Sequence, residues 1–312
     1  KSADKGAAGQ SQMKMLRRLP KLLKYIPGSA QDVRADFLTL QYWLSGSRDN
    51  MANLARYLVG RYATGERAKI AEALRPAEPP VEYPDVGVYH PAMSPRIAAD
   101  SSKLPSPREP VGRVGVLMLR SYLLGANAGH YDGVLAALES RGLAVVPVFS
   151  SGLDARPAIE KFLKKDGKPL VDAVVSLTGF SLVGGPAYND AAAAEAVLAS
   201  LDVPYTAAHP VEFQTLDEWG DSERGLSPVE STIMVAIPEL DGAISPMVFG
   251  GRAGAPGVTC HGCSHACEFS ESDNRQDMHS CPERASSLAA RVVRQVRLSK
   301  TPTSERKIAT DL

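Results

Sequence analysis

The sequence has no excess of charge of either sign, because its 35 lysines and arginines are balanced by 35 aspartates and glutamates. Nucleic acids and anionic membranes attract proteins with a strong basic surplus, and this chain offers none. It also lacks an apolar run close to the roughly 20 residues that a membrane-spanning helix needs. We therefore expect a soluble, cytoplasmic protein with no nucleic-acid partner and no transmembrane segment.

Several catalytic signatures are absent as well. There is no G-x-x-x-x-G-K-[ST] phosphate loop, so we do not expect the chain to hydrolyse ATP itself. There is no G-x-S-x-G nucleophile elbow and no H-E-x-x-H zinc motif. The glycines of LLGANAGH do not form the dinucleotide fingerprint G-x-G-x-x-G. These absences exclude the commonest routes to nucleotide, acyl-transfer and zinc-hydrolase chemistry.

Cysteine is scarce, yet its four copies, Cys260, Cys263, Cys267 and Cys281, share one segment, TCHGCSHACEFSESDNRQDMHSCPER. Thiols gathered at short spacings favour a metal site, in which the distant fourth cysteine completes the ligand shell. The site would suit an iron–sulfur cluster, with 4Fe-4S as the first choice, or Zn²⁺, for which histidines of the same segment could replace a thiol. Disulfides with redox switching, or unrelated thiols, are the alternatives.

The composition divides the chain into six parts. We predict a disordered lead (1–12), a helical segment (13–75), a proline-rich connector (76–111), an α/β domain (112–250), a cysteine-rich metal loop (251–281), and a C-terminal helix with the start of a next segment (282–312). The basic face of the helical segment could meet a phosphate or an acidic partner, and a solvated helix surface is the simpler interpretation. Because the chain starts with lysine and ends in a polar stretch, we interpret it as a piece of a longer protein.

Buried strands alternate with amphipathic helices in the predicted α/β domain. The apolar runs GRVGVLML, LAVVPVFS and VDAVVSLTG are typical of strands that are buried on both faces of a parallel sheet. The segments between them have helical spacing, so we predict a doubly wound, mostly parallel, Rossmann-like sheet. Ligands of such sheets bind at the carboxyl ends of the strands.

Five residues near these strand ends are candidates for substrate binding: His130, Gly184, Gly185, His209 and Glu212. His130 follows the first strand and could shuttle protons or bind a metal, which makes it the candidate catalytic residue. A packing or capping role is its alternative. Gly184 and Gly185 could present backbone N–H groups to a carboxylate or a flat ligand, or form a tight turn.

Several long motifs in order resemble a known family. They are LRRLPKLLKYIPGSAQDVRADFLTLQYWLSGSRDNMANLARYLVGRYA, VGVLMLRSYLLGANAGHYDGVLAALESRGLAVVPVFSSGLD, VSLTGFSLVGGPA, LDVPY, FQTLDEW and PELDGAISPMVFGGR. Across nearly all of residues 13–310, the chain is similar to a fragment of the large, porphyrin-binding H subunits of magnesium chelatase. The cobaltochelatase large subunits share the α/β motifs, but the helical segment fits the magnesium enzymes better. The cysteine segment resembles the version found in bacteriochlorophyll-making bacteria.

The resemblance implies a role in (bacterio)chlorophyll biosynthesis, as part of a ligase that forms nitrogen–metal bonds. The full subunit would bind protoporphyrin IX and receive Mg²⁺ as a substrate, while separate AAA+ subunits hydrolyse ATP. The methyltransferase that acts on Mg-protoporphyrin is a further implied partner. No catalytic residue is carried over from the family, because much of the porphyrin enclosure is expected beyond residue 312. The alternatives are a cobaltochelatase subunit acting on a corrinoid precursor, and a non-catalytic, redox-sensing scaffold that docks the ATPase subunits.

Overall fold

The computed structural model of the chain describes residue 20 and residues 22–185, 188–243, 246–254 and 277–300. The predicted cysteine ligands Cys260, Cys263 and Cys267 lie outside these ranges. The chain divides into two units, the first formed by residues 1–83 with 124–126 and the second by residues 84–123 with 127–312.

The first unit is helical where it is described. Its elements are α2 (Ala30–Ser45), α3 (Arg48–Tyr62), the short 3-10 turn η1 (Gly65–Arg67) and α4 (Ala68–Ala73). Gly46 ends α2 with a left-handed φ of 61°, a backbone conformation that glycine adopts without a steric penalty. Ser47 then caps α3, because its hydroxyl accepts a hydrogen bond of 3.1 Å from the N–H of Asn50. This glycine–serine pair therefore makes a sharp corner between the two helices.

The segment after α4 is held on these helices by side chains. The amide of Asn50 donates to the carbonyl of Val81 at 2.8 Å and accepts from its N–H at 2.9 Å. Asn53 accepts from the N–H of Glu78 at 3.1 Å, and the Tyr42 hydroxyl donates to the carbonyl of the same glutamate. Prolines in this stretch cannot donate to a strand ladder. The buried asparagines therefore supply the partners that a neighbouring strand would otherwise give.

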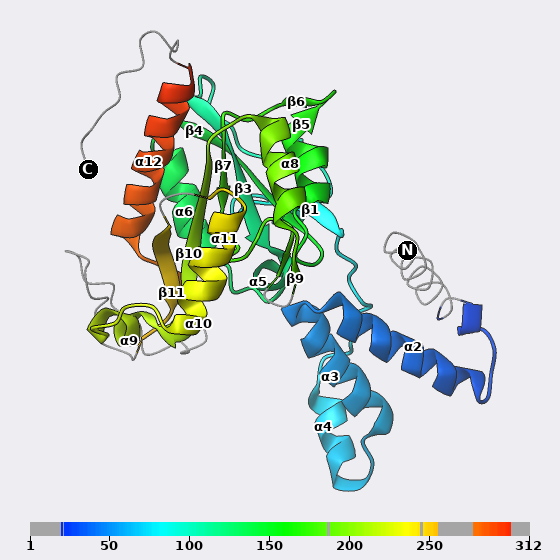
Figure 1. Cartoon of the computed structure of the whole chain (residues 1–312). Helices are drawn as coiled ribbons and strands as arrows, with labels where there is room; N and C mark the ends of the chain where they lie inside the picture. The colour runs from blue at the N-terminus through cyan, green and yellow to red at the C-terminus, as the bar shows by residue number, and fades with distance from the viewer. Residues whose placement is uncertain (1–19, 21, 186–187, 244–245, 255–276, 301–312) are drawn as a thin grey trace. The chain divides into compact units, whose positions relative to one another are not determined.

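The second unit is built on a sheet of eight strands in the order β12-β11-β10-β7-β3-β4-β1-β2 (Figure 1). The strands are β1 (Val86–Tyr89), β2 (Ile97–Ala98), β3 (Gly112–Leu119), β4 (Leu143–Ser150), β7 (Ala173–Ser176), β10 (Tyr205–Thr215), β11 (Met247–Arg252) and β12 (Met278–Ser280). The central strands from β11 to β4 are parallel, and β12, β1 and β2 pair antiparallel at the two edges. Two small hairpins pair β5 (Lys164–Lys165) with β6 (Lys168–Pro169), and β8 (Gly184–Gly185) with β9 (Tyr188–Asn189).

Helices cover both faces of this sheet (Figure 1). One face packs against α6 (Gly129–Glu139) and α12 (Pro282–Lys300), and the other against α7 (Arg156–Ala158), the π-helical turn η2 (Ile159–Leu163) and α8 (Ala191–Leu201). Along β3, Val116 and Met118 join the first core, while Leu117 between them joins the second. This alternation follows from the two-residue period of a strand, and it confirms the predicted doubly wound, mostly parallel α/β fold.

Short helices connect the remaining strands at the carboxyl edge of the sheet. They are α5 (Arg120–Leu124), α9 (Leu216–Asp221), α10 (Pro228–Glu230), the π-helical turn η3 (Ser231–Ala236) and α11 (Ile237–Leu240). Because π-helical turns in proteins are frequent at functional sites, η3 marks this edge for attention.

Three strands differ from the sequence-based expectation. β1 and β2 lie within the range predicted as a connector, where they add antiparallel edge strands to the sheet. β10 continues past His209 to Thr215, although Pro210 cannot donate a ladder hydrogen bond. A register shift between His209 and Pro210 in the pairing with β11 absorbs the proline. His209 and Glu212 therefore lie within a strand rather than beyond its end.

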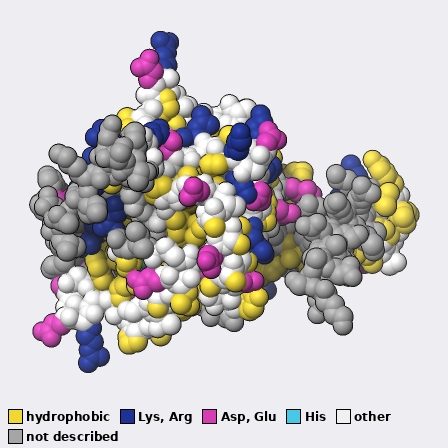
Figure 2. Space-filling view, turned by 45° about the horizontal axis from the view of Figure 1, so that its top comes forward, with side chains coloured by type: hydrophobic (Ala, Val, Ile, Leu, Met, Phe, Trp, Pro, Cys, Tyr) yellow, Lys and Arg dark blue, Asp and Glu magenta, His cyan; other side chains and the backbone are white. Residues whose placement is uncertain are grey.

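The surface carries no dominant charge on the face that Figure 2 shows, where acidic and basic side chains are interspersed with small apolar patches. Among the described residues, no helix has both the length and the apolar character needed to cross a membrane.

Candidate functional site

A narrow, mostly apolar pocket lies where the carboxyl ends of β3, β4 and β7 meet. Leu119, Ser150 and Thr178 line it together with Phe180 and Leu182. β3 and β7 are neighbours whose connections leave toward opposite sides of the sheet, which is the position where doubly wound folds bind ligands. The hydroxyl of Ser150 is buried and has no hydrogen-bond partner in the part of the chain that the structure describes. We name this the switch-point pocket.

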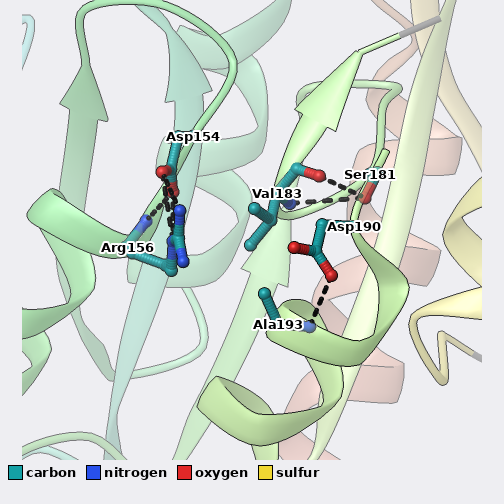
Figure 3. A network of polar contacts seen from close by, with 6 residues as sticks. All are labelled: Asp154, Arg156, Ser181, Val183, Asp190 and Ala193. Atoms are coloured by element: carbon teal, nitrogen blue, oxygen red, sulfur yellow. Dashed lines mark hydrogen bonds and ion pairs between the residues drawn. The ribbon is translucent and has the colours of Figure 1, made fainter. Parts of the chain in front are cut away.

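Polar contacts fix the loops around the switch-point pocket (Figure 3). Asp154 accepts hydrogen bonds from the Arg156 side chain at 3.0 and 2.7 Å, and Asp190 caps α8 by accepting from the N–H of Ala193 at 3.0 Å. Ser181 donates to the buried carboxylate of Asp241 at 3.0 Å, and that carboxylate also accepts from the Leu182 N–H at 2.7 Å. The lining loops are therefore held in place by internal bonds.

Gly184 and Gly185 form the hairpin beside this pocket. Gly184 has a φ of 112°, and a Cβ there would overlap the carbonyl oxygen of Tyr188. A Cβ on Gly185 would overlap the side chain of Leu153. The N–H of Gly184 donates to the Leu153 carbonyl at 2.9 Å, so in this structure it is not available to a ligand. Gly184 is thus required by the backbone of the tight turn, the alternative to its predicted binding role, whereas a Cβ on Gly185 would meet only the end of the Leu153 side chain.

His130, the candidate catalytic residue, lies in the first turn of α6 and is fully buried. Its ring is 3.8 Å from that of Tyr131 and stacks on Phe249 at 5.8 Å, and Tyr122 meets it edge-on at 4.9 Å. Neither ring nitrogen has a hydrogen-bond partner among the described residues. Burial, with a smaller contribution from nearby His279, lowers the pKa of His130 to about 3, so the imidazole is neutral at pH 7.

Glu212 lies beside Tyr122, on the strand β10. Burial raises the pKa of Glu212, a hydrogen bond with Tyr122 lowers it, and the neighbouring Glu230 raises it again. One oxygen of the Glu212 carboxyl group is buried with no hydrogen-bond partner in the described ranges. The pKa of Tyr122 is raised by burial and by the charge of Glu212, so the phenol stays a hydrogen-bond donor.

His209 and Glu230 extend this group along β10. Burial lowers the pKa of His209 to about 4, although the carboxylate of Glu230 opposes that shift. Glu230 is fully buried, and its Oε2 accepts from the Gln214 amide at 2.8 Å and from the Ser227 N–H at 2.9 Å. Its Oε1 has no hydrogen-bond partner within the described residues.

These five residues form a continuous group that we name the buried acid–base cluster. Its members are His130, Tyr122, Glu212, Glu230 and His209, which are linked in this order by a ring contact, a hydrogen bond and two electrostatic interactions. Burial raises the pKa of the Glu212 carboxyl group, which favours its protonated form. Burial lowers the pKa of the two imidazoles, which keeps them neutral. Within the cluster, the Glu212 carboxyl group can accept a proton, and the Tyr122 hydroxyl can donate a hydrogen bond to it. Among the described residues, no three histidine, cysteine or carboxylate side chains are placed to hold a metal ion.

Sequence reasoning found three of these five residues and missed Tyr122 and Glu230. Glu230 ends the motif Ser227-Pro-Val-Glu, which has the pattern of a helix capping box, and the structure confirms that cap. Because the capping pattern already explains this glutamate, the sequence did not indicate that Glu230 also interacts with His209 and Glu212. Tyr122 follows the first buried strand in a segment that was interpreted only as a loop.

Cys281 is the one predicted metal ligand that the structure describes. It is fully buried before α12, and it takes part in a disulfide whose partner lies outside the described residues. Its N–H donates to the carbonyl of Phe249 at 3.0 Å, and Phe249 stacks on His130. Cys281 is thereby connected to the buried acid–base cluster through Phe249.

Comparisons with known proteins agree on one family. The family model described as CobN/Magnesium Chelatase matches residues 40–312, and a domain of unknown function (DUF3479) matches residues 1–37. The chain is 49% identical to the magnesium-chelatase H subunit of Rhodobacter capsulatus, over 99% of this chain and 25% of that protein. It is 36% identical to the chloroplastic magnesium-chelatase subunit ChlH of Oryza sativa subsp. japonica, over 97% of this chain and 21% of that protein.

A solved structure supports the fold. The catalytic subunit of cobaltochelatase from Mycobacterium tuberculosis aligns with a TM-score of 0.57 at 23% identity, covering 88% of this chain and 20% of that one. The chain thus spans about a quarter of the length of the most similar of these relatives.

Proposed function

The chain belongs to the CobN/magnesium chelatase family, and from this we propose that it is part of the porphyrin-binding H subunit of a magnesium chelatase. The longer protein would insert Mg²⁺ into protoporphyrin IX during (bacterio)chlorophyll biosynthesis, in the cytoplasm. Identities of 49% and 36% to subunits of that name support magnesium over cobalt. The similar cobaltochelatase structure, at 23% identity, bears on the fold alone.

The observation that carries the chemistry is the buried acid–base cluster. Metal insertion into a porphyrin requires that two pyrrole protons leave and that Mg²⁺, which releases its water reluctantly, arrives dehydrated. A base for this step works best when its pKa lies near the working pH. Glu212, whose pKa is raised by burial, meets that condition better than His130, whose pKa of about 3 makes it a weak base.

We assign the residues of the cluster different roles. Glu212 is the proposed proton acceptor, and the hydrogen bond with Tyr122 stabilises its ionised form once it has released the proton again. His130 and His209 are neutral at pH 7, so they add no positive charge that would repel the arriving Mg²⁺. The proposed ATPase activity belongs to separate AAA+ subunits, in keeping with the missing phosphate loop. The Mg-protoporphyrin methyltransferase remains a predicted partner.

The replacement of Glu212 by glutamine tests this proposal, because it keeps the shape of the side chain and removes its basicity. In the longer protein, assayed with its ATPase subunits, E212Q should slow Mg²⁺ insertion by about 10²-fold, the lower end for the loss of a general base. The affinity for protoporphyrin IX, followed by its Soret band, should stay unchanged. An unaltered insertion rate would exclude Glu212 as the proton acceptor.

Titration of the 312-residue chain with protoporphyrin IX tests whether the substrate site reaches into it. Saturable binding with a shifted Soret band and quenched tryptophan fluorescence is the expected result. If the longer protein binds and this chain does not, the porphyrin site lies elsewhere in the subunit. The same titration with a corrinoid precursor separates the magnesium enzyme from the cobaltochelatase alternative.

The four cysteines are proposed to hold an iron–sulfur cluster, with Zn²⁺ as the alternative. The gathering of all four cysteines in one short segment supports this proposal. A bound iron–sulfur cluster would make the segment sensitive to redox conditions, whereas zinc would stabilise its fold. Metal analysis of the chain, purified without oxygen and with a thiol reductant, should show iron or zinc that C281S loses. The absence of both metals, even after reconstitution, would refute the site.

One observation favours a second candidate function. Because Cys281 takes part in a disulfide and its N–H binds the carbonyl of Phe249, oxidation could act on the buried acid–base cluster without any metal. In that case the chain would be a redox-sensing scaffold. Activation by the ATPase subunits would then depend on the thiol–disulfide state in a metal-free protein, and C281S would abolish that dependence.

A further inference from the structure

The helical first unit carries a groove that is lined by basic side chains. Arg34 of α2, Arg56 and Arg61 of α3, and Arg75 beyond α4 surround Tyr57. The groove is open to solvent. All of these residues belong to the first unit, so the groove exists within one unit. We name it the basic groove.

The charge of the basic groove is largely uncompensated. No carboxylate side chain is among the residues that line it. Arg61 pairs with Asp32 at 2.8 Å, but the Asp32 side chain is 77% exposed and does not line the groove. Within the described part of the chain, Arg34, Arg56 and Arg75 make no ion pair. Arginine side chains without a carboxylate present planar donor groups that fit carboxylates in pairs of hydrogen bonds.

Tyr57 gives the groove a polar centre. Its hydroxyl is buried and has no hydrogen-bond partner among the described residues. Burial raises the pKa of Tyr57, and the nearby charges of Arg61 and Arg34 lower it in part. Tyr62 and the exposed Asp36 act on this phenol in the opposite sense and raise its pKa. A neutral phenol that is flanked by two guanidinium groups can donate to an incoming anion.

Apolar side chains lie between the arginines. Ala71, Leu74 and Pro76 line the same groove, and the side chain of Leu74 is 38% exposed. A small inorganic anion would gain nothing from these contacts, whereas a peptide that alternates acidic and apolar residues would use both kinds. The pattern therefore favours a polypeptide over a free ion.

The ends of this chain do not provide such a peptide. Residues 1–19 contain one acidic residue, Asp4, against five lysines and arginines, and residues 301–312 contain two acidic and two basic residues. We propose that the basic groove binds an acidic segment, interspersed with apolar residues, of a partner protein. This inference is independent of the proposed metal insertion, since the groove and the buried acid–base cluster belong to different units.

A labelled peptide of repeated Glu-Glu-Leu triplets tests the proposal by fluorescence anisotropy on the 312-residue chain. Charge reversal by Arg56→Glu together with Arg75→Glu should weaken binding at least about tenfold, because like charges then face the peptide. Arg67→Glu is the matched control, since Arg67 is exposed on the same unit and does not line the groove. It should change the affinity less than about twofold. Circular dichroism verifies that each variant is folded.

Four results would overturn the proposal. Equal binding by the double variant and the wild type would place the peptide elsewhere. Complete competition by glutarate, a small dicarboxylate, would show a site for free anions instead of a peptide. Binding to phosphatidylserine vesicles with no affinity for the peptide would identify a lipid surface. A Lys-Lys-Leu peptide should fail to bind the wild type, and binding by it would exclude charge recognition.

Discussion

Replacing Gly133 by alanine should destabilise the second unit, although the same change in most helices is stabilising. Gly133 lies inside α6, where it faces β12, the short strand that precedes Cys281. A Cβ at this position would overlap the hydroxyl of Ser280 and lie 2.5 Å from its Cβ. The serine hydroxyl can rotate away, but the Ser280 Cβ moves only with the strand.

The strand has little freedom to move. A Cβ on Gly129 would lie 2.7 Å from the Met278 carbonyl oxygen, and one on Gly250 would overlap that of His279, so β12 is packed between glycines of α6 and β11. Overpacking of this kind costs about 1–3 kcal/mol. Alanine gains about 1 kcal/mol over glycine in a helix interior. With the overpacking cost near its upper end, we expect a net loss of about 2 kcal/mol for G133A.

Urea unfolding followed by tryptophan fluorescence measures this loss. Trp219 lies in the second unit and Trp43 in the first, so a Trp43→Phe background isolates the second unit. Ser280→Gly removes both clashing atoms, and a cycle of the two single changes and the double change should give a coupling of about 2–3 kcal/mol.

Gly60→Ala provides the propensity control. Gly60 is also inside a helix, α3, and a Cβ added there would have nothing within 4 Å, so alanine should stabilise the first unit by about 0.5–1 kcal/mol. If G133A stabilised its unit to the same extent, or if Ser280→Gly did not rescue it, the tight packing of β12 would be refuted.

Three other changes have defined outcomes. The pKa of His209 falls from 6.5 in the unfolded chain to about 4 in the folded one, so the second unit should lose stability as pH falls from about 6.5 to about 4. Urea midpoints should show a flatter pH profile in H209L, and an unchanged profile would contradict the shift. Asn50→Ala removes both bonds to Val81 and should cost the first unit about 1–3 kcal/mol, measured through Trp43 in a Trp219→Phe background. Asp241→Ala leaves the buried donors of Ser181 and Leu182 without their acceptor. Proteolytic cleavage in the loop beside the switch-point pocket should therefore increase. Unchanged cleavage would show that the loop is held by other contacts.

The central strands were predictable because their signal is local. β3 and β4 are continuous apolar runs, as burial on both faces requires, and α12 shows its buried face at helical spacing. β1 and β2 were not predicted, since edge strands in a proline-rich segment depend on their pairing with β4. The length of β10 was missed for a similar reason, because Pro210 looks like a strand end until β11 is placed beside it.

Three residues of the candidate site could be named from the sequence, but their environment could not. The rule for strand ends selected His130, His209 and Glu212, but the structure places His209 and Glu212 within β10 and His130 in the first turn of α6. What burial does to their pKa values depends on side chains from distant parts of the chain, such as Phe249 against His130. Sequence spacing carries no information on that packing. The predicted metal site stays a prediction, since three of its four cysteines lie outside the described residues.

The pairing of β11 with β12 has a consequence for how this family could diversify. The N–H of Ala253 donates to the carbonyl of Asp277 at 2.8 Å, so the chain leaves the sheet and returns to it at neighbouring points. The ends of the intervening segment are therefore held close together by the sheet. Such a segment can change in length at small cost, since each doubling of its length adds only about 0.6 kcal/mol of closure entropy. The segment between Ala253 and Asp277 can therefore vary independently of the sheet. A related protein could have a shorter segment there, or one without cysteines, and keep the same sheet.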